Sequence, residues 1–237
     1  MLSSARIEQI KKLLEVINIQ TDNLVLFDEA LTHPSFNNES HINKCYDYER
    51  LEFLGDSVLR LFAGQYLYEK YPDYNEGQLT KIRSCIVSDK FLSGIAYKLE
   101  YYKYIDMGLG EEKDRGREKE SVLACTFEAV LGAIYLSSGF LNAKNFIYQI
   151  YDAANIEETM HYYNAKERLQ EYTQGINKDL PEYKVIKESG PAHDKIFEVG
   201  VYYHGNEIGT GKGKTKKEAE QTAARHALKT LNITSSN

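Results

Sequence analysis

The sequence has few cysteines, no long apolar run and no excess of positive charge, and each absence excludes a class of protein. Its three cysteines, Cys45, Cys85 and Cys125, are odd in number and outside any metal-binding pair spacing, which predicts a reduced, cytoplasmic setting. No apolar run approaches the roughly 20 residues that a membrane-spanning helix needs. Residues 1–14 place Lys11 and Lys12 within a helical pattern and lack the apolar core of a secretory signal. We therefore expect a cytoplasmic globular protein without a membrane partner.

The chain of 237 residues has a formal net charge of −6, which by itself argues against a nucleic-acid partner. The charge is unevenly distributed, however. Residues 1–164 hold 17 lysines and arginines against 25 acids, a balance of −8, whereas residues 165–237 hold 12 against 10, a balance of +2. Four lysines of the second part lie within residues 212–217. An acidic front and a locally basic back predict two domains with different tasks.

Apolar residues recur at helical spacing through the front of the chain, so residues 1–157 are expected to form an all-α domain. Residues 164–232 combine helical patterns with short β-prone runs. These elements are a helix over residues 165–173, strands over 182–188, 196–203 and 207–211, and a final helix over 215–231. An α-β-β-β-α order predicts one sheet with helices on one face, and hence a small α+β domain after the all-α one.

Residues 48–60 are rich in apolar side chains and are predicted to form a helix that is buried on most sides. The same stretch carries Glu49, Glu52 and Asp56, whose spacings of three and four place them roughly on one helix face. A second apolar helix, over residues 121–135, carries Glu128. Burying even one carboxylate costs several kcal/mol unless a positive charge compensates for it.

Two kinds of compensation fit these acids. Converging carboxylates suit hard Mg²⁺ or Mn²⁺, and two such ions about 4 Å apart form a site that cleaves phosphodiesters. The alternative is a purely structural network in which Glu49 and Glu52 form ion pairs with arginines. The arginines available for such pairs are Arg50, Arg60 and Arg83.

The residues 49–59, which read E-R-L-E-F-L-G-D-S-V-L, closely resemble the signature of the ribonuclease III family. Residues 30–36, 76–80 and 121–135 resemble further motifs of that family in the same order, so the resemblance covers essentially the whole chain. It implies a homodimeric endoribonuclease that cuts double-stranded RNA with Mg²⁺, leaving 5′-phosphate and 3′-hydroxyl ends. It also implies processing of ribosomal and messenger RNA precursors.

The resemblance assigns roles to individual residues. Glu52, Asp56 and Glu128 correspond to metal-coordinating acids, and Asp56 and Glu128 correspond to the pair usually named as catalytic. Glu49 lies at the edge of this cluster. Two further residues match the family outside this cluster: Phe53 matches an aromatic that inserts into the partner subunit, and Glu76 lies in a segment facing the RNA. Without the resemblance, a phenylalanine in an apolar helix such as Phe53 is by default a core residue.

One position departs from the family pattern. An aspartate is expected three residues before Glu128, but the chain has Cys125 there. A thiol in an apolar helix is mostly protonated, and sulfur is a poor ligand for Mg²⁺. This departure has three possible consequences: water fills the vacant coordination position, Mn²⁺ is preferred, or cleavage is lost while RNA binding is retained. Cys125 is otherwise simply a small buried hydrophobic residue.

Residues 164–231 resemble a double-stranded RNA-binding domain, in a first helix, in the loop at 190–193 and at the lysine-rich start of the final helix. Such a domain reads the shape of A-form duplexes. The RNA-binding residues that the match implies are Gln170, Gln174, His193, Lys214, Lys216 and Lys217. The glycines before the final helix are interpreted as letting backbone N–H groups approach phosphates. The alternatives are a solvated helix start for the lysines, a plain loop residue for His193 and, for the front domain, a dimerisation scaffold that does not act on RNA.

Overall fold

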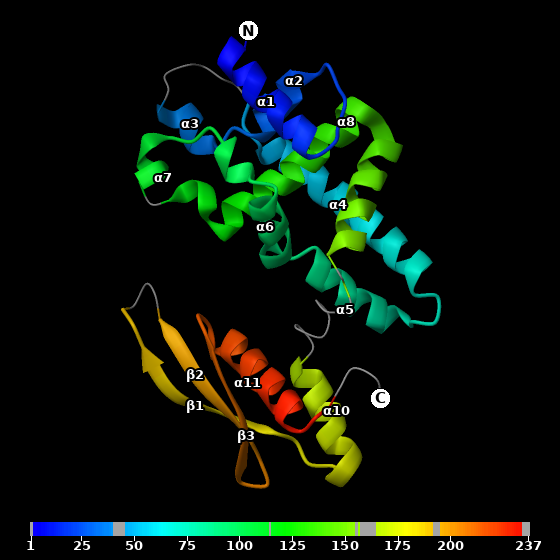
Figure 1. The fold of residues 1–237 in the computed structure, drawn as a ribbon, viewed down its shortest axis with the longest axis vertical. Helices are drawn as coiled ribbons and strands as arrows, with labels where there is room; N and C mark the ends of the chain where they lie inside the picture. Colours follow the sequence, from blue (N-terminus) through cyan, green and yellow to red (C-terminus); the bar gives the residue numbers. More distant parts are fainter. Residues whose placement is uncertain are drawn as a thin grey trace. The chain divides into compact units, whose positions relative to one another are not determined.

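Two long helices, α4 (Glu49–Lys70) and α8 (Glu120–Ala153), form the centre of the first part of the computed structural model (Figure 1). The structure describes residues 2–39, 46–113, 115–154, 156, 165–191 and 195–233. The chain divides into two compact units, Met1–Ala154 and Asn155–Asn237.

The first unit is helical, which confirms the predicted all-α class of the front domain. Its other elements are α1 (Ser4–Val16), α2 (Leu24–Ala30), α3 (Pro34–Glu39), α5 (Glu76–Ile86), α6 (Asp89–Lys98), η1 (Tyr101–Lys103), α7 (Leu109–Lys113) and η2 (Gly116–Glu118). Among its described residues the only β-type pairing is an isolated bridge between Thr32 and Asp106. Pro34 begins the short helix α3, and the glycine-rich segment 108–119 contains the short elements α7 and η2.

Polar side chains cap the N-termini of several of these helices. Ser3 Oγ accepts a hydrogen bond from the backbone N–H of Arg6 at the start of α1, and Ser88 Oγ accepts one from Phe91 at the start of α6. Asn75 and Gln78 form a reciprocal capping box before α5. Each cap satisfies backbone donors that the helix itself leaves unpaired, so the start of α6, and with it Asp89, is set locally.

α8 passes through the core of the first unit. By length and composition alone it is apolar enough to cross a membrane, but 61% of its most apolar window is buried inside the protein, as expected of a core helix. The helix is interrupted at Gly139, whose φ of 81° and ψ of 175° are not helical. The predicted helix over residues 121–135 is thus the part of α8 that precedes this break.

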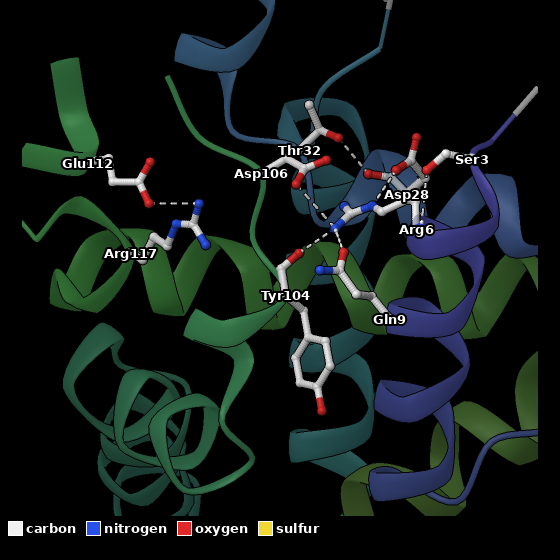
Figure 2. Close-up of polar contacts among 9 residues, drawn as sticks. All are labelled: Ser3, Arg6, Gln9, Asp28, Thr32, Tyr104, Asp106, Glu112 and Arg117. Atoms are coloured by element: carbon white, nitrogen blue, oxygen red, sulfur yellow. Dashed lines mark hydrogen bonds and ion pairs between the residues drawn. The ribbon is translucent and has the colours of Figure 1, made fainter. Parts of the chain in front are cut away.

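A buried arginine ties the N-terminal helix to the rest of the first unit (Figure 2). Arg6 Nε donates to Asp28 Oδ1 on α2 at 2.7 Å, and Arg6 Nη1 donates to the backbone oxygen of Tyr104 at 2.7 Å. Asp106 Oδ1 lies 3.3 Å from the same Nη1. Arg6 and Asp28 are both buried, so this charged pair is compensated inside the domain.

The second unit has the α-β-β-β-α order that the sequence predicts. Its elements are α10 (Ala165–Asn177), β1 (Glu182–Ser189), β2 (Ile196–Tyr203), β3 (Asn206–Gly213) and α11 (Lys216–Thr230). The strands form one antiparallel sheet in the order β1-β2-β3. Figure 1 shows α10 and α11 on one face of this sheet. The core between the layers combines Leu169 of α10, Val199 and Val201 of β2 and buried alanines of α11.

Glycines at alternate positions of β3 bring α11 against the strand. A Cβ on Gly209 would lie 2.6 Å from the backbone nitrogen of Ala227, and one on Gly211 would lie 2.2 Å from that of Ala223. A Cβ on Gly213 would lie 2.6 Å from the nitrogen of Ala219. The structure therefore gives these glycines a role within the fold: they allow close packing of helix on strand.

Candidate functional site

α4 and α8 cross with their backbones in contact, and two glycines make this crossing possible. A Cβ on Gly55 of α4 would lie 1.8 Å from the backbone oxygen of Glu128, and one on Gly132 of α8 would lie 2.4 Å from that of Leu51. No larger residue fits at either position without moving a helix. Because Gly55 lies between Glu52 and Asp56 in the sequence, the crossing sets these acids beside Glu128.

The structure brings three of the predicted acids into one electrostatic cluster. Glu52, Asp56 and Glu128 are each partly buried. The pKa of Glu128 is raised to about 8, first by burial and then by the negative charges of Asp56, Glu52 and Asp89. Glu49 is exposed, and its charge acts on the neighbouring rings of Tyr48 and His33. Glu49 thus lies at the edge of the cluster.

One arginine partly neutralises this cluster. Arg60 Nε donates to both Oδ1 and Oδ2 of Asp56, each at 2.8 Å, and the Arg60 charge lowers the pKa of Glu128. The sequence allowed ion pairs between arginines and Glu49 or Glu52. The structure has such a pair at Asp56 instead. Arg83, another of the arginines considered, donates to the hydroxyl of Thr80 at 3.4 Å.

Cys125 lies one turn before Glu128 and faces the same acids. Its thiol is free and only partly exposed. Burial, a hydrogen bond to Glu52 and the charges of Glu52, Glu128 and Asp89 raise the pKa of the thiol to about 12. The protonated thiol that the sequence predicts is therefore present at neutral pH, and its S–H group donates to the Glu52 carboxylate.

Two residues of this cluster escaped the sequence analysis. Asp89 is the first residue of α6, and its charge acts on both Cys125 and Glu128. An acid after a serine N-cap is an ordinary helix start, so nothing local distinguishes Asp89. Tyr48 is buried before α4, and this burial, followed by the electrostatic effects of Cys125 and Glu52, raises the pKa of its phenol. The aromatic character of Tyr48 alone predicts only a core residue.

The donor chemistry of the cluster fits a hard divalent ion. Its groups are carboxylates, the oxygen ligands that Mg²⁺ and Mn²⁺ favour, and the mutual repulsion felt by Glu128 is what such an ion would relieve. Within the described ranges, no three histidine, cysteine, aspartate or glutamate side chains are already grouped closely enough to hold a metal ion. The ligand identities therefore fit, while the side chains adopt an arrangement in which Asp56 pairs with Arg60.

Phe53 lies on the opposite side of α4 from the core. Its side chain is 79% exposed, so the reading of Phe53 as a core residue is wrong, as is the expectation that the helix is buried on most sides. Leu61, two turns further along, is also exposed. An exposed aromatic side chain of this size is a candidate anchor for contact with another protein. Glu76 is exposed at the start of α5 and accepts a hydrogen bond from Thr80 Oγ1 at 2.8 Å.

In the second unit, the predicted RNA-binding residues occupy two exposed helix surfaces. Gln170 and Gln174 lie one turn apart on α10. Lys214, Lys216 and Lys217 flank Thr215, whose hydroxyl caps the start of α11, where the helix dipole favours an anion. Lys216 Nζ also lies 3.5 Å from Glu188 Oε1 on β1. The remaining predicted residue, His193, lies outside the described residues.

Carboxylates gathered at a helix crossing, in a helical domain that is followed by an α-β-β-β-α module with a lysine-rich helix start, define a nuclease-type architecture. Comparison with known families specifies it further. Residues 23–153 match the family model described as Ribonuclease-III-like, and residues 165–231 match the one described as Double-stranded RNA binding motif. The chain belongs to the ribonuclease III family.

Relatives and solved structures agree with this assignment. Ribonuclease 3 of Borreliella burgdorferi is 45% identical over 232 residues, which cover 97% of this chain and 94% of that protein. Ribonuclease 3 of Bacillus licheniformis is 42% identical over 226 residues, covering 94% and 90%. A nuclease-domain structure of ribonuclease III from Campylobacter jejuni, described as flexible in a region involved in dimer formation, matches with a TM-score of 0.55 and 39% identity. It covers 59% of this chain and 96% of that one.

Proposed function

We propose that this protein is an endoribonuclease that cleaves double-stranded RNA by divalent-metal-assisted hydrolysis, leaving 5′-phosphate and 3′-hydroxyl ends. The observation that carries the proposal is the glycine-mediated crossing of α4 and α8, which sets Glu52 and Asp56 against Glu128 in a chain of the ribonuclease III family. Asp56 and Glu128 are the proposed catalytic pair.

Glu52, Asp56 and Glu128 would hold the metal, with Glu49 at the edge of the site. Bound Mg²⁺, or Mn²⁺ in its place, would supply charge that stabilises the phosphodiester transition state and activates the attacking water. The protein's own contribution is placement. Gly55 and Gly132 fix the distance between the two acid-bearing helices, and the Cys125 thiol donates a hydrogen bond to Glu52.

The second unit supplies the duplex-binding surface in this proposal. Gln170, Gln174 and His193 would contact 2′-hydroxyls in minor grooves, and Lys214, Lys216 and Lys217 would contact phosphates across the intervening major groove. The domain limits that we propose are residues 1–157 and 164–232. Exposed Phe53 would insert into a second copy, giving a homodimer. Processing of ribosomal and messenger RNA precursors in the cytoplasm is the corresponding cellular task.

A second candidate function is binding of double-stranded RNA with impaired cleavage. The observation that favours it is Cys125, whose protonated thiol stands where the family pattern has an aspartate. A neutral thiol adds neither negative charge nor a hard oxygen ligand, so the site holds its ion with one carboxylate fewer. Mn²⁺, which accepts softer ligands than Mg²⁺, would then support more activity.

The deciding experiment incubates the purified full-length protein with long duplex RNA in Mg²⁺ and, separately, in Mn²⁺. We expect endonucleolytic products that carry 5′-phosphates, with Glu128→Gln as the inactive control. Duplex binding measured over a salt series should weaken steeply with salt, because phosphate contacts release counterions. Intact binding without cleavage in either ion would leave the second candidate function; the absence of both would contradict both candidates.

A further inference from the structure

The ion pair between Arg60 and Asp56 occupies the carboxylate that the proposed reaction needs. Arg60 lies one turn after Asp56 on α4, and its Nε lies 2.8 Å from both carboxylate oxygens. A single N–H group thus contacts both atoms that Asp56 would offer to a metal ion. The two side chains are 59% and 34% exposed, so the guanidinium can leave the carboxylate without any change in the backbone.

Arg60 also provides positive charge to the rest of the acidic cluster. The charges of Asp56, Glu52 and Asp89 act on Glu128 in one direction, and the Arg60 charge opposes them. A divalent ion at this place would act on the same carboxylates in the same sense, with twice the charge. The guanidinium and the metal ion would therefore neutralise the same negative charge by contacting the same Asp56 oxygens.

We propose that Arg60 is the counter-ion of the metal-free site and that a divalent cation must displace it from Asp56 in order to bind. The inference rests on the proposed function, since it takes Asp56 to be a metal ligand. Arg60 is then a positioning residue: it holds the Asp56 side chain while the metal is absent and raises the metal concentration at which the site fills. Exposed ion pairs are weak, so the competition should change metal affinity by about two- to fivefold.

The test compares wild-type protein with Arg60→Gln in the absence of RNA. Binding of Mn²⁺ is followed by the electron paramagnetic resonance signal of the free ion, and binding of Mg²⁺ by its effect on the thermal unfolding midpoint. We expect both dissociation constants to fall about two- to fivefold in Arg60→Gln. Arg60→Lys, which keeps the positive charge, should fall between the two proteins.

Arg50→Gln is the matched control. Arg50 is an exposed arginine of the same helix, but its charge acts on Glu29, so this variant removes a positive charge from α4 away from Asp56. The inference is overturned if Arg60→Gln binds metal no more tightly than wild type, or if Arg50→Gln gains as much. Under either of these outcomes the proposed metal site itself would still be supported, provided that the wild type binds metal saturably and Asp56→Asn abolishes this binding. If wild-type protein shows no saturable binding, the proposed metal site fails together with the inference.

Discussion

At the scale of single residues, this site differs from the ribonuclease III pattern at one position, residue 125. Cys125 places an S–H donor where a carboxylate is expected, and that donor bonds to Glu52. The substitution removes a ligand and a negative charge, yet it leaves Glu52, Asp56 and Glu128 in the cluster. Activity should therefore be limited by metal binding at low metal concentration.

Cys125→Asp should lower the Mg²⁺ concentration needed for half-maximal cleavage, on the order of tenfold, because it adds a hard oxygen ligand. The same variant should unfold at a lower temperature than wild type in EDTA, since a further carboxylate joins Glu52 and Glu128 and no additional positive charge joins Arg60. Cleavage rates over an Mg²⁺ series and thermal melts in EDTA measure the two effects. Cys125→Ser, which adds no carboxylate, should show neither; equal gains in both variants would contradict the ligand argument.

At the scale of elements, glycines decide how closely helices approach their neighbours. Gly55 and Gly132 let α4 and α8 touch, and the glycines of β3 do the same for α11. In each case an added methyl group would overlap backbone atoms, which cannot rotate away as the end of a flexible side chain can. Both units thus depend on glycine for close packing.

Gly55→Ala should destabilise the first unit by about 1–3 kcal/mol or more and should abolish cleavage, because its Cβ must push α8 away from α4. Gly64→Ala on the same helix is the control. Its nearest neighbour would be Arg83 Nη1 at 4.0 Å, so this alanine should be neutral or stabilising by up to about 1 kcal/mol. Denaturant melts and cleavage assays measure both variants. Similar losses in the two would mean that helix contact at Gly55 is not the cause.

Gly211→Ala should unfold or loosen the second unit and weaken duplex binding, since its Cβ would lie 2.2 Å from the backbone nitrogen of Ala223. Gly175→Ala in α10 meets no atom within 4 Å and should be harmless. Gel-shift titrations with duplex RNA, together with melts of the full chain, measure the effect. Unchanged binding and stability in Gly211→Ala would refute the packing role assigned to this glycine.

At the scale of the whole molecule, the exposed aromatic of α4 is the feature that points to a second copy. Burying Phe53 in a partner would remove from water a side chain that is 79% exposed in the single chain. A central aromatic of this kind often dominates an interface, with a cost of 2 kcal/mol or more when truncated, roughly a thirtyfold weaker association.

Phe53→Ala should therefore shift the protein toward monomer at micromolar concentration while leaving the melting of the single chain nearly unchanged. Sedimentation velocity over a concentration series measures the association. Val25→Ala, at another exposed apolar position (63%) on α2, should leave association as in wild type. Equal association of wild type and Phe53→Ala would exclude Phe53 from the dimer contact.

Local patterns in the sequence determined much of this protein. Helical spacing and β-prone runs predicted the all-α class of the first unit and the order of elements in the second, because these patterns depend on neighbours a few residues apart. The resemblance at residues 49–59 and in its companion motifs likewise singled out Glu52, Asp56 and Glu128, the acids that the fold brings into one cluster. A match to eleven consecutive residues needs no knowledge of how the helices pack.

Only the tertiary structure decided what surrounds those residues. It placed Gly55 against Glu128, brought Asp89 from another helix to the same acids, paired Arg60 with Asp56 and left Phe53 in solvent. It also turned the glycines of β3 toward α11. These outcomes depend on which faces of distant elements meet. An apolar helix pattern shows that a face is covered, but it does not show which neighbour covers it.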